Sequence, residues 1–171
     1  MDSTLEKQVS RLWVSGEEQL YTTLGINLKT VERAQDSGNR EVLQEAQVWD
    51  AQFKPEDTGM GPGALELLKD FGQTWWVKFE PKIYDLLCNR KNPEHEKFMD
   101  ALGGSAKELA MVLAPSLVAS LAGALPAVVV VVATIAAKKI ADSGLEAMCE
   151  VWAEARTEDE AEAKPEAEAE G

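Results

Sequence analysis

A stretch of 29 residues without a charged side chain limits what this chain can fold into. It runs from Leu109 to Ala137 and is flanked by charged residues at positions 107–108 and 138–139. Exposing so much apolar surface to water is unfavourable, so the stretch has to be buried in its own protein, in a partner or in lipid. Where it is buried is the main functional question that the sequence raises.

The breakers inside this stretch indicate a helical hairpin. Gly123 and Pro126 fall near its centre and leave two legs of about 13–16 apolar residues, whereas a membrane span needs about 20. Five consecutive valines, Val128–Val132, favour a strand by propensity, but no other segment offers a partner strand. We therefore predict a helix there, and we expect packing to offset the weak helix propensity of valine.

Short amphipathic helices are predicted on the N-terminal side of the hairpin. Residues 1–53 show helical spacing of apolar side chains, with a break at Gly25, a stop at Gly38 and a cap at Asn39. Residues 54–63 form a linker rich in Gly and Pro. A helical core over 64–153 follows, in which Pro81 is expected to restart the chain.

The fold prediction is therefore an all-α, compact bundle around a central apolar helical hairpin at about 105–152. Ser105 fits the start of a capping box that begins the first leg, and Pro126 suits the first position of the second. Residues 154–171 carry eight acidic and two basic side chains and few large apolar ones, which predicts a disordered acidic tail.

Charge and compartment signals narrow the function classes. A net charge of −13 disfavours nucleic-acid binding, which needs a surface rich in Lys and Arg. The N-terminus shows no secretory signal, which leads us to expect a cytoplasmic protein. In that compartment Cys88 and Cys149 are expected to stay reduced, although a disulfide between them is an alternative.

Catalytic and metal-binding signals are weak. His95, the only histidine, lies between two glutamates near a predicted helix start and is expected to be exposed. A dyad of Cys88 and His95 lacks any marked oxyanion hole, and with Cys149 these residues match no familiar zinc spacing. We expect no enzyme activity, no cofactor and no metal, with thiol chemistry at Cys88 as a minor alternative.

The sequence predicts a non-enzymatic helical interaction module that binds a protein partner or itself through apolar helix faces. The alternative is a membrane-active protein that inserts the 109–137 hairpin as a pore-former or an anchor. The paired tryptophans 75 and 76 have two interpretations: both line the core, or one projects as an anchor for a partner or a membrane. The candidate contacts for a partner or a membrane are Trp75, Trp76, Phe79, Val128, Val132 and Trp152.

Overall fold

The computed structural model describes residues 3–47, 49, 59, 61–120 and 125–154, and these residues form helices and short connections without any strand. This confirms the all-α prediction. Most of the linker and nearly all of the acidic tail lie outside the described residues. The helices are α1 (Ser3–Trp13), α2 (Glu17–Ser37), α3 (Arg40–Glu45), α5 (Pro62–Leu87), α6 (His95–Gly104), α7 (Ala106–Ser120), α8 (Pro126–Ser143) and residues 145–154.

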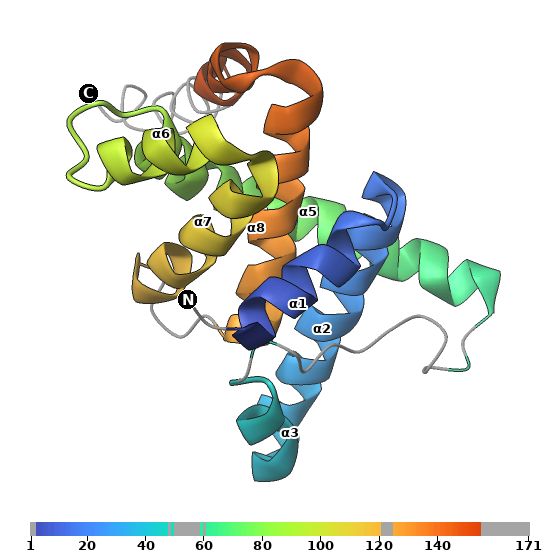
Figure 1. The fold of residues 1–171 in the computed structure, drawn as a ribbon. Coiled ribbons are helices and arrows are strands. Elements are labelled where there is room, and N and C mark those ends of the chain that lie inside the picture. The colour runs from blue at the N-terminus through green and yellow to red at the C-terminus, as the bar shows by residue number, and fades with distance from the viewer. Residues whose placement is uncertain (1–2, 48, 50–58, 60, 121–124, 155–171) are drawn as a thin grey trace, which may run out of the picture.

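Helix α8 is the centre of the bundle (Figure 1) and packs against α1, α2, α5 and α7. Every residue from Ala127 to Ala137 is buried, including the five valines. The hydroxyl of Thr134 donates to the carbonyl oxygen of Val130 at 2.8 Å, so the one polar side chain in this run is satisfied. The valines therefore lie in a helix, as predicted, and other parts of the same chain bury them.

Helix α7 is the first leg of the hairpin and packs along α8. Pro115 lies inside α7 without ending the helix, and this residue is exposed. The turn at 121–124 is outside the described residues. No helix in the part of the chain that the structure describes combines the length and the apolar character needed to cross a bilayer.

Several helix boundaries follow the local signals in the sequence. Gly38 has φ +70° after the end of α2, and the side-chain oxygen of Asn39 accepts a hydrogen bond from the amide of Val42. The hydroxyl of Ser105 accepts from the amide of Glu108 at 3.2 Å, and Pro126 occupies the first turn of α8. These boundary predictions are confirmed.

Two predicted breaks do not exist, because α2 continues through Gly25 and α5 continues through Pro81. Gly25 instead lets α2 approach α5 closely, as described below. Pro81 removes the N–H that would bond the carbonyl of Val77 four residues earlier. Val77 is 50% exposed, so water can solvate that carbonyl and the helix continues.

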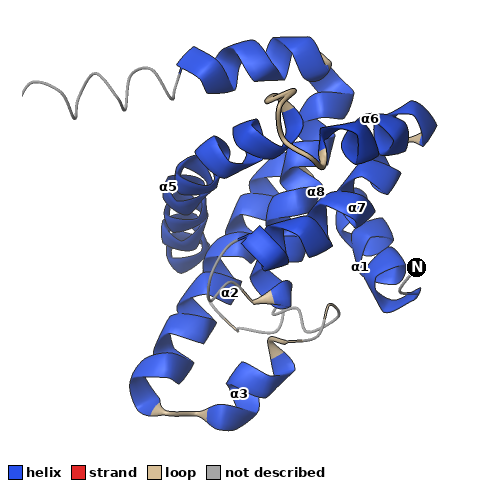
Figure 2. Ribbon diagram, turned by 90° about the vertical axis from the view of Figure 1, so that its left-hand side faces the viewer, coloured by secondary structure: helices blue, strands red, loops and turns tan. Residues whose placement is uncertain are grey.

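Helix α5 is the longest of the named helices and lies at the edge of the molecule (Figure 2). It packs mainly on α2 and only slightly on α6 and α8. Trp76, Ile83, Leu86 and Leu87 are buried towards the bundle, whereas Leu67 is 72% exposed. One flank of α5 is therefore the place where apolar side chains remain accessible.

Candidate interaction surface

Four apolar side chains form a row along this flank, and we call Leu67, Phe71, Trp75 and Phe79 the α5 ridge. They are four residues apart, so successive members are neighbours on the helix surface, and the row turns around α5 by about 40° at each step. The ring centroids of Phe71 and Trp75 are 6.3 Å apart, and those of Trp75 and Phe79 are 6.5 Å apart. Leu67 is exposed and the three aromatic residues are half-buried, so the ridge is continuous and partly open to solvent.

Two glycines hold α5 in contact with α2. A Cβ atom at Gly72 would lie 2.0 Å from the carbonyl oxygen of Tyr21, and one at Gly25 would lie 1.9 Å from that of Leu68. The two backbones are therefore in direct contact, which only glycine permits at these positions. This close approach fixes α5 on α2, and Leu67, Phe71 and Trp75 keep part of their side chains exposed beside that contact.

Two lysines lie over the aromatic rings of the ridge. The Nζ atom of Lys29, from α2, is 4.2 Å from the centroid of Phe71. The Nζ atom of Lys78 is 4.1 Å from that of Trp75. Such contacts stabilise by about 0.5–1 kcal/mol at exposed sites. The ridge is therefore an amphipathic surface, with aromatic faces and cationic side chains beside them.

The six residues predicted to contact a partner or a membrane divide into two groups. Trp76, Val128, Val132 and Trp152 are at most 5% exposed, so the chain itself covers them. Trp75 and Phe79 are half-buried and belong to the ridge. In this structure only the second group presents side-chain surface that a partner could reach.

Leu67 and Phe71 were not among the predicted contact residues. Their spacing to Trp75 and Phe79 is visible in the sequence and could have pointed to them. Helical spacing alone does not tell which flank of α5 is covered. The glycine contact with α2 decides that, and it appears only in the folded chain.

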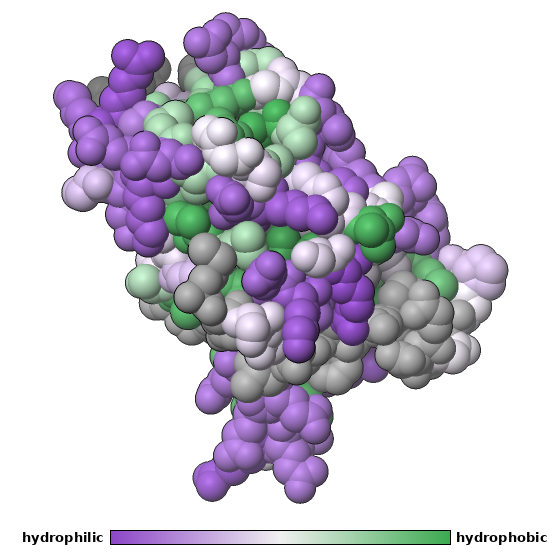
Figure 3. Space-filling model, in the orientation of Figure 1, coloured by the Kyte–Doolittle hydropathy of each residue, from purple (hydrophilic) through white to green (hydrophobic). Residues whose placement is uncertain are grey.

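The remaining surface is more polar. Figure 3 shows that the projection formed by the end of α2 and by α3 is hydrophilic, while apolar residues gather around residues 145–154 and α6. Val151 is 54% exposed in that second region. Met148 and Trp152 in that region are buried, so among the described residues there Val151 is the large apolar side chain that is exposed.

Cys88 and Cys149 form a disulfide, which corrects the expectation of reduced thiols. The end of α5 and residues 145–154 bring the two Cα atoms to 5.7 Å, within the usual range for a bridge. The expectation had relied on the compartment and not on geometry. Reduced thiols were expected because a cytoplasmic location was expected, and the disulfide does not support that location. The Cys88 thiol is not available as a nucleophile.

His95 is half-buried, not exposed as expected, and begins α6. Its Nδ1 atom is enclosed and has no hydrogen-bond partner among the described residues. The described part of the chain contains no group of three or more His, Cys, Asp or Glu side chains that could hold a metal ion.

Two lysines near the end of α8 connect the hairpin to the corner between α1 and α2. The Nζ of Lys138 donates to the carbonyl oxygens of Trp13 and Ser15 at 2.8 and 2.7 Å. The Nζ of Lys139 donates to Glu17 Oε1 at 2.5 Å, and the same oxygen accepts from the Tyr21 hydroxyl at 3.0 Å. The charges that end the apolar stretch therefore have a structural role.

Burial and these hydrogen bonds shift the pKa values at the corner. Burial raises the pKa of Tyr21 to about 12. The hydrogen bond from Lys139 lowers the pKa of Glu17 below its ordinary value. Burial lowers the pKa of Lys139, but the hydrogen bonds with Glu17 and Tyr21 outweigh it, and the net direction is upward. The ion pair and the neutral phenol are therefore stable near neutral pH.

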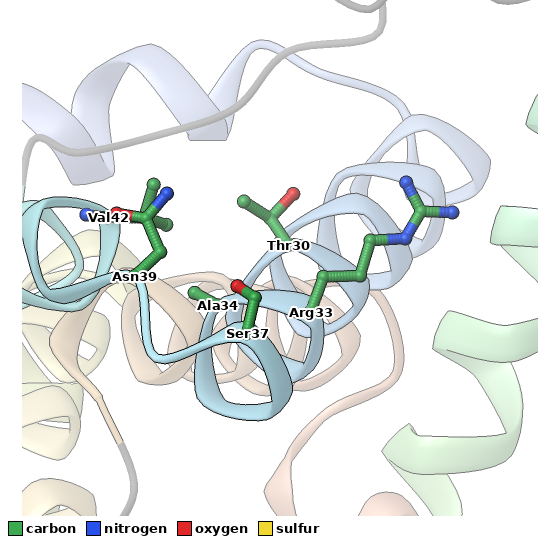
Figure 4. Close-up of a pocket in the computed structure, with 6 residues that line it drawn as sticks. All are labelled: Thr30, Arg33, Ala34, Ser37, Asn39 and Val42. Carbon is green, nitrogen blue, oxygen red and sulfur yellow. Dashed lines mark hydrogen bonds between the residues drawn. The ribbon is translucent and has the colours of Figure 1, made fainter.

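A cavity of about 210 Å³ lies between α2 and α3 (Figure 4). Its polar groups are largely used within the chain: the hydroxyl of Thr30 donates to the carbonyl of Ile26, and Asn39 caps α3. Arg33 is the one charged side chain in the lining, and it is exposed. This arrangement offers no set of converging groups for catalysis. The lining residues are Thr30, Arg33, Ala34, Ser37, Asn39 and Val42.

Comparison with known proteins returned no matching family model, no matching curated protein and no matching solved structure.

Proposed function

We propose that this chain is a non-enzymatic helical interaction module that binds a protein partner on the α5 ridge. The observation that carries the proposal is the continuous, partly exposed row of Leu67, Phe71, Trp75 and Phe79. Aromatic side chains dominate the binding energy of many protein interfaces, because they bury a large area with few rotatable bonds. The disulfide at Cys88 adds support, since it removes the one thiol considered for catalysis.

The geometry of the ridge suits a helix or an extended apolar segment of the partner. A row of side chains spaced four residues apart can pack into the groove between the rows of another helix. Lys29 and Lys78 lie beside this row and can pair with acidic side chains at the rim of the interface. A partner with an apolar stripe bordered by acids fits this surface best.

Site-specific photo-crosslinking tests the proposal. A photoreactive amino acid is placed at Leu67 in one variant and at Val14 in a control variant, in the full chain with its disulfide. Both residues are apolar and exposed, at 72% and 84%, but Val14 lies at the end of α1, outside the ridge. We expect a specific adduct from position 67 in cell extract and none from position 14. Equal adducts at both positions, or none at either, would contradict a docking site on α5.

A second candidate is the membrane-active protein, and the enclosed hairpin favours it. Residues 127–137 of α8 are all buried and uncharged, and amphipathic helices surround them, so an uncovered hairpin would present an apolar surface to lipid. Flotation with anionic liposomes, at neutral and at acidic pH, tests this function. Co-flotation that persists in Trp75→Ala, which changes the α5 ridge and leaves the hairpin intact, would support it, and an unbound protein at both pH values would reject it.

A further inference from the structure

We infer that residues 145–154 are a redox-controlled latch, which the disulfide between Cys88 and Cys149 holds on the end of α5 and which reduction releases. This device is separate from the α5 ridge and goes beyond the proposed function. The latch is a helix that lies at the same end of the bundle as α6 (Figures 1 and 2). The chain has two cysteines, so their bridge is the one cross-link between the latch and the rest of the molecule.

Few side chains of the latch are buried. Met148 and Trp152 are buried, whereas three glutamates of the latch are exposed. A helix shorter than about 12–15 residues is marginal in water by itself, because its first turn is costly to form. The latch therefore needs an attachment to the bundle, and two buried side chains form a small one. Its position depends on the disulfide.

The indole of Trp152 favours opening once the disulfide is reduced. Trp152 is 1% exposed, and its Nε1 atom has no hydrogen-bond partner among the described residues. A buried N–H without an acceptor loses the hydrogen bond that it makes with water in the unfolded chain. When the latch opens, water can accept from this N–H, which offsets part of the apolar contact that Trp152 gives up.

Gly144 is the point on which the latch can turn. It is exposed, has φ +86°, a conformation that favours glycine, and a Cβ atom there would meet no atom within 4 Å. It separates the latch from α8, which has its own attachment: Lys138 and Lys139 donate hydrogen bonds to the corner between α1 and α2. The latch can therefore move while α8 stays in place.

The reductant is a dithiol, which acts by thiol–disulfide exchange. Neither cysteine is fully buried, so a small thiolate can approach the bridge. The thiolate attacks one Sγ atom, the bond between the two cysteines breaks, and the other cysteine leaves as a thiolate. The second thiol of the reductant then attacks the mixed disulfide. The reductant ends as a disulfide, the cysteine pair gains two electrons and two protons, and the freed latch exposes Met148 and Trp152.

Hydrogen exchange of the full chain, with and without dithiothreitol, tests the latch. In the oxidised protein we expect the amides of residues 145–154 to be protected. After reduction they should exchange within about tenfold of the rate of an unstructured peptide, while the amides of α8 stay strongly protected. The double variant Cys88→Ser/Cys149→Ser should show the open pattern with or without dithiothreitol, and reoxidation of the wild type should restore protection.

Tryptophan emission is an independent readout that follows the latch itself. Reduction should shift the emission of the wild type to longer wavelength, because Trp152 enters water, and should leave Trp152→Phe unshifted. Three results would overturn the latch. The first is unchanged protection of residues 145–154 after reduction. The second is loss of protection in α8 together with that segment, which would make the bridge a support of the whole fold. The third is an equal emission shift in the wild type and in Trp152→Phe.

Discussion

Helices α8 and α5 are both rich in large apolar side chains, but the chain covers them very differently. Helix α8 has neighbours in α1, α2, α5 and α7, and Val132 is 0% exposed. Helix α5 packs mainly on α2, and Leu67 is 72% exposed. The number of packed neighbours, and not apolar content, decides which helix becomes core and which presents a surface.

The difference has a functional consequence. The uncharged stretch drew attention to the hairpin as a membrane or partner contact, yet the hairpin is the part of the molecule least available for contact. The α5 ridge is interrupted by charged residues in the sequence and looks ordinary there. In the folded chain these residues form a row along α5 in which Leu67 is exposed and the three aromatic side chains are half-buried.

The largest expected effect comes from a charge placed in the enclosed helix. Val130 is 0% exposed, so Val130→Asp would bury a carboxylate without a partner and destabilise the fold by about 5 kcal/mol or more. That is comparable with the whole stability of a domain of this size. Circular dichroism and denaturant unfolding should show loss of the cooperative fold.

Val77→Asp on α5 is the matched control, because Val77 is 50% exposed and its new carboxylate would remain in water. We expect a change within about 0.5 kcal/mol. If both variants unfold equally, or if Val130→Asp keeps its unfolding midpoint, the contrast between an enclosed α8 and an open α5 is wrong.

The disulfide gives the next largest effect and connects the end of α5 to the segment that follows α8. It closes a loop of 61 residues, for which the chain-entropy model gives about 4 kcal/mol. We expect Cys88→Ser and Cys149→Ser each to lower the free energy of unfolding by up to that amount. Urea unfolding of the wild type with and without reductant checks this. The free energy of unfolding of the double variant should equal that of each single variant, and adding a reductant should not change it for any of the three.

The glycine contact gives an intermediate effect and tests how α5 is held. Gly72→Ala would place a methyl group 2.0 Å from the carbonyl oxygen of Tyr21, so the helices have to separate. We expect a loss of about 3 kcal/mol, at the upper end of overpacking effects. Gly63→Ala in the same helix meets no atom within 4 Å and should be neutral or slightly stabilising. Equal midpoints for the two variants in thermal unfolding would contradict the close contact.

Local signals in the sequence predicted much of the fold. Capping residues such as Asn39 and Ser105, and Gly38 after α2, act within a few residues, so their effect is readable without tertiary structure. The burial of the valines at 128–132 also followed from the sequence, because such a run has no stable alternative in water. The prediction of a central hairpin depended only on these local and compositional features.

The wrong and incomplete predictions have one physical cause: each concerned a feature that depends on residues far away in the sequence. Gly25 was predicted to break a helix, but it lies where α5 touches α2. Pro81 was predicted to restart the chain, but the residue one turn earlier, Val77, is half exposed and the helix continues. The disulfide needed the positions of two segments 61 residues apart. The ridge itself was only half predicted, through Trp75 and Phe79, because periodicity does not reveal which flank α2 covers.

The smallest effect is confined to alkaline pH and tests the corner where α8 meets α2. The pKa of Tyr21 in the folded chain is raised to about 12, above its ordinary value of 10.0, so the unfolded chain loses this proton first. Stability should therefore be unchanged below pH 10 and should fall as the pH rises towards 12. Lys139, whose pKa is also raised, adds a loss in the same direction above its ordinary value of 10.5. Urea unfolding at pH 8, 10 and 11 measures this slope, and Tyr21→Phe should make it shallower without removing it.

Tyrosinate absorbance of the wild type minus that of Tyr21→Phe gives the titration of Tyr21 itself. A midpoint near 10 would mean that the phenol is not buried, and that α2, which supports α5, is less firmly attached to the hairpin than the lysine contacts indicate.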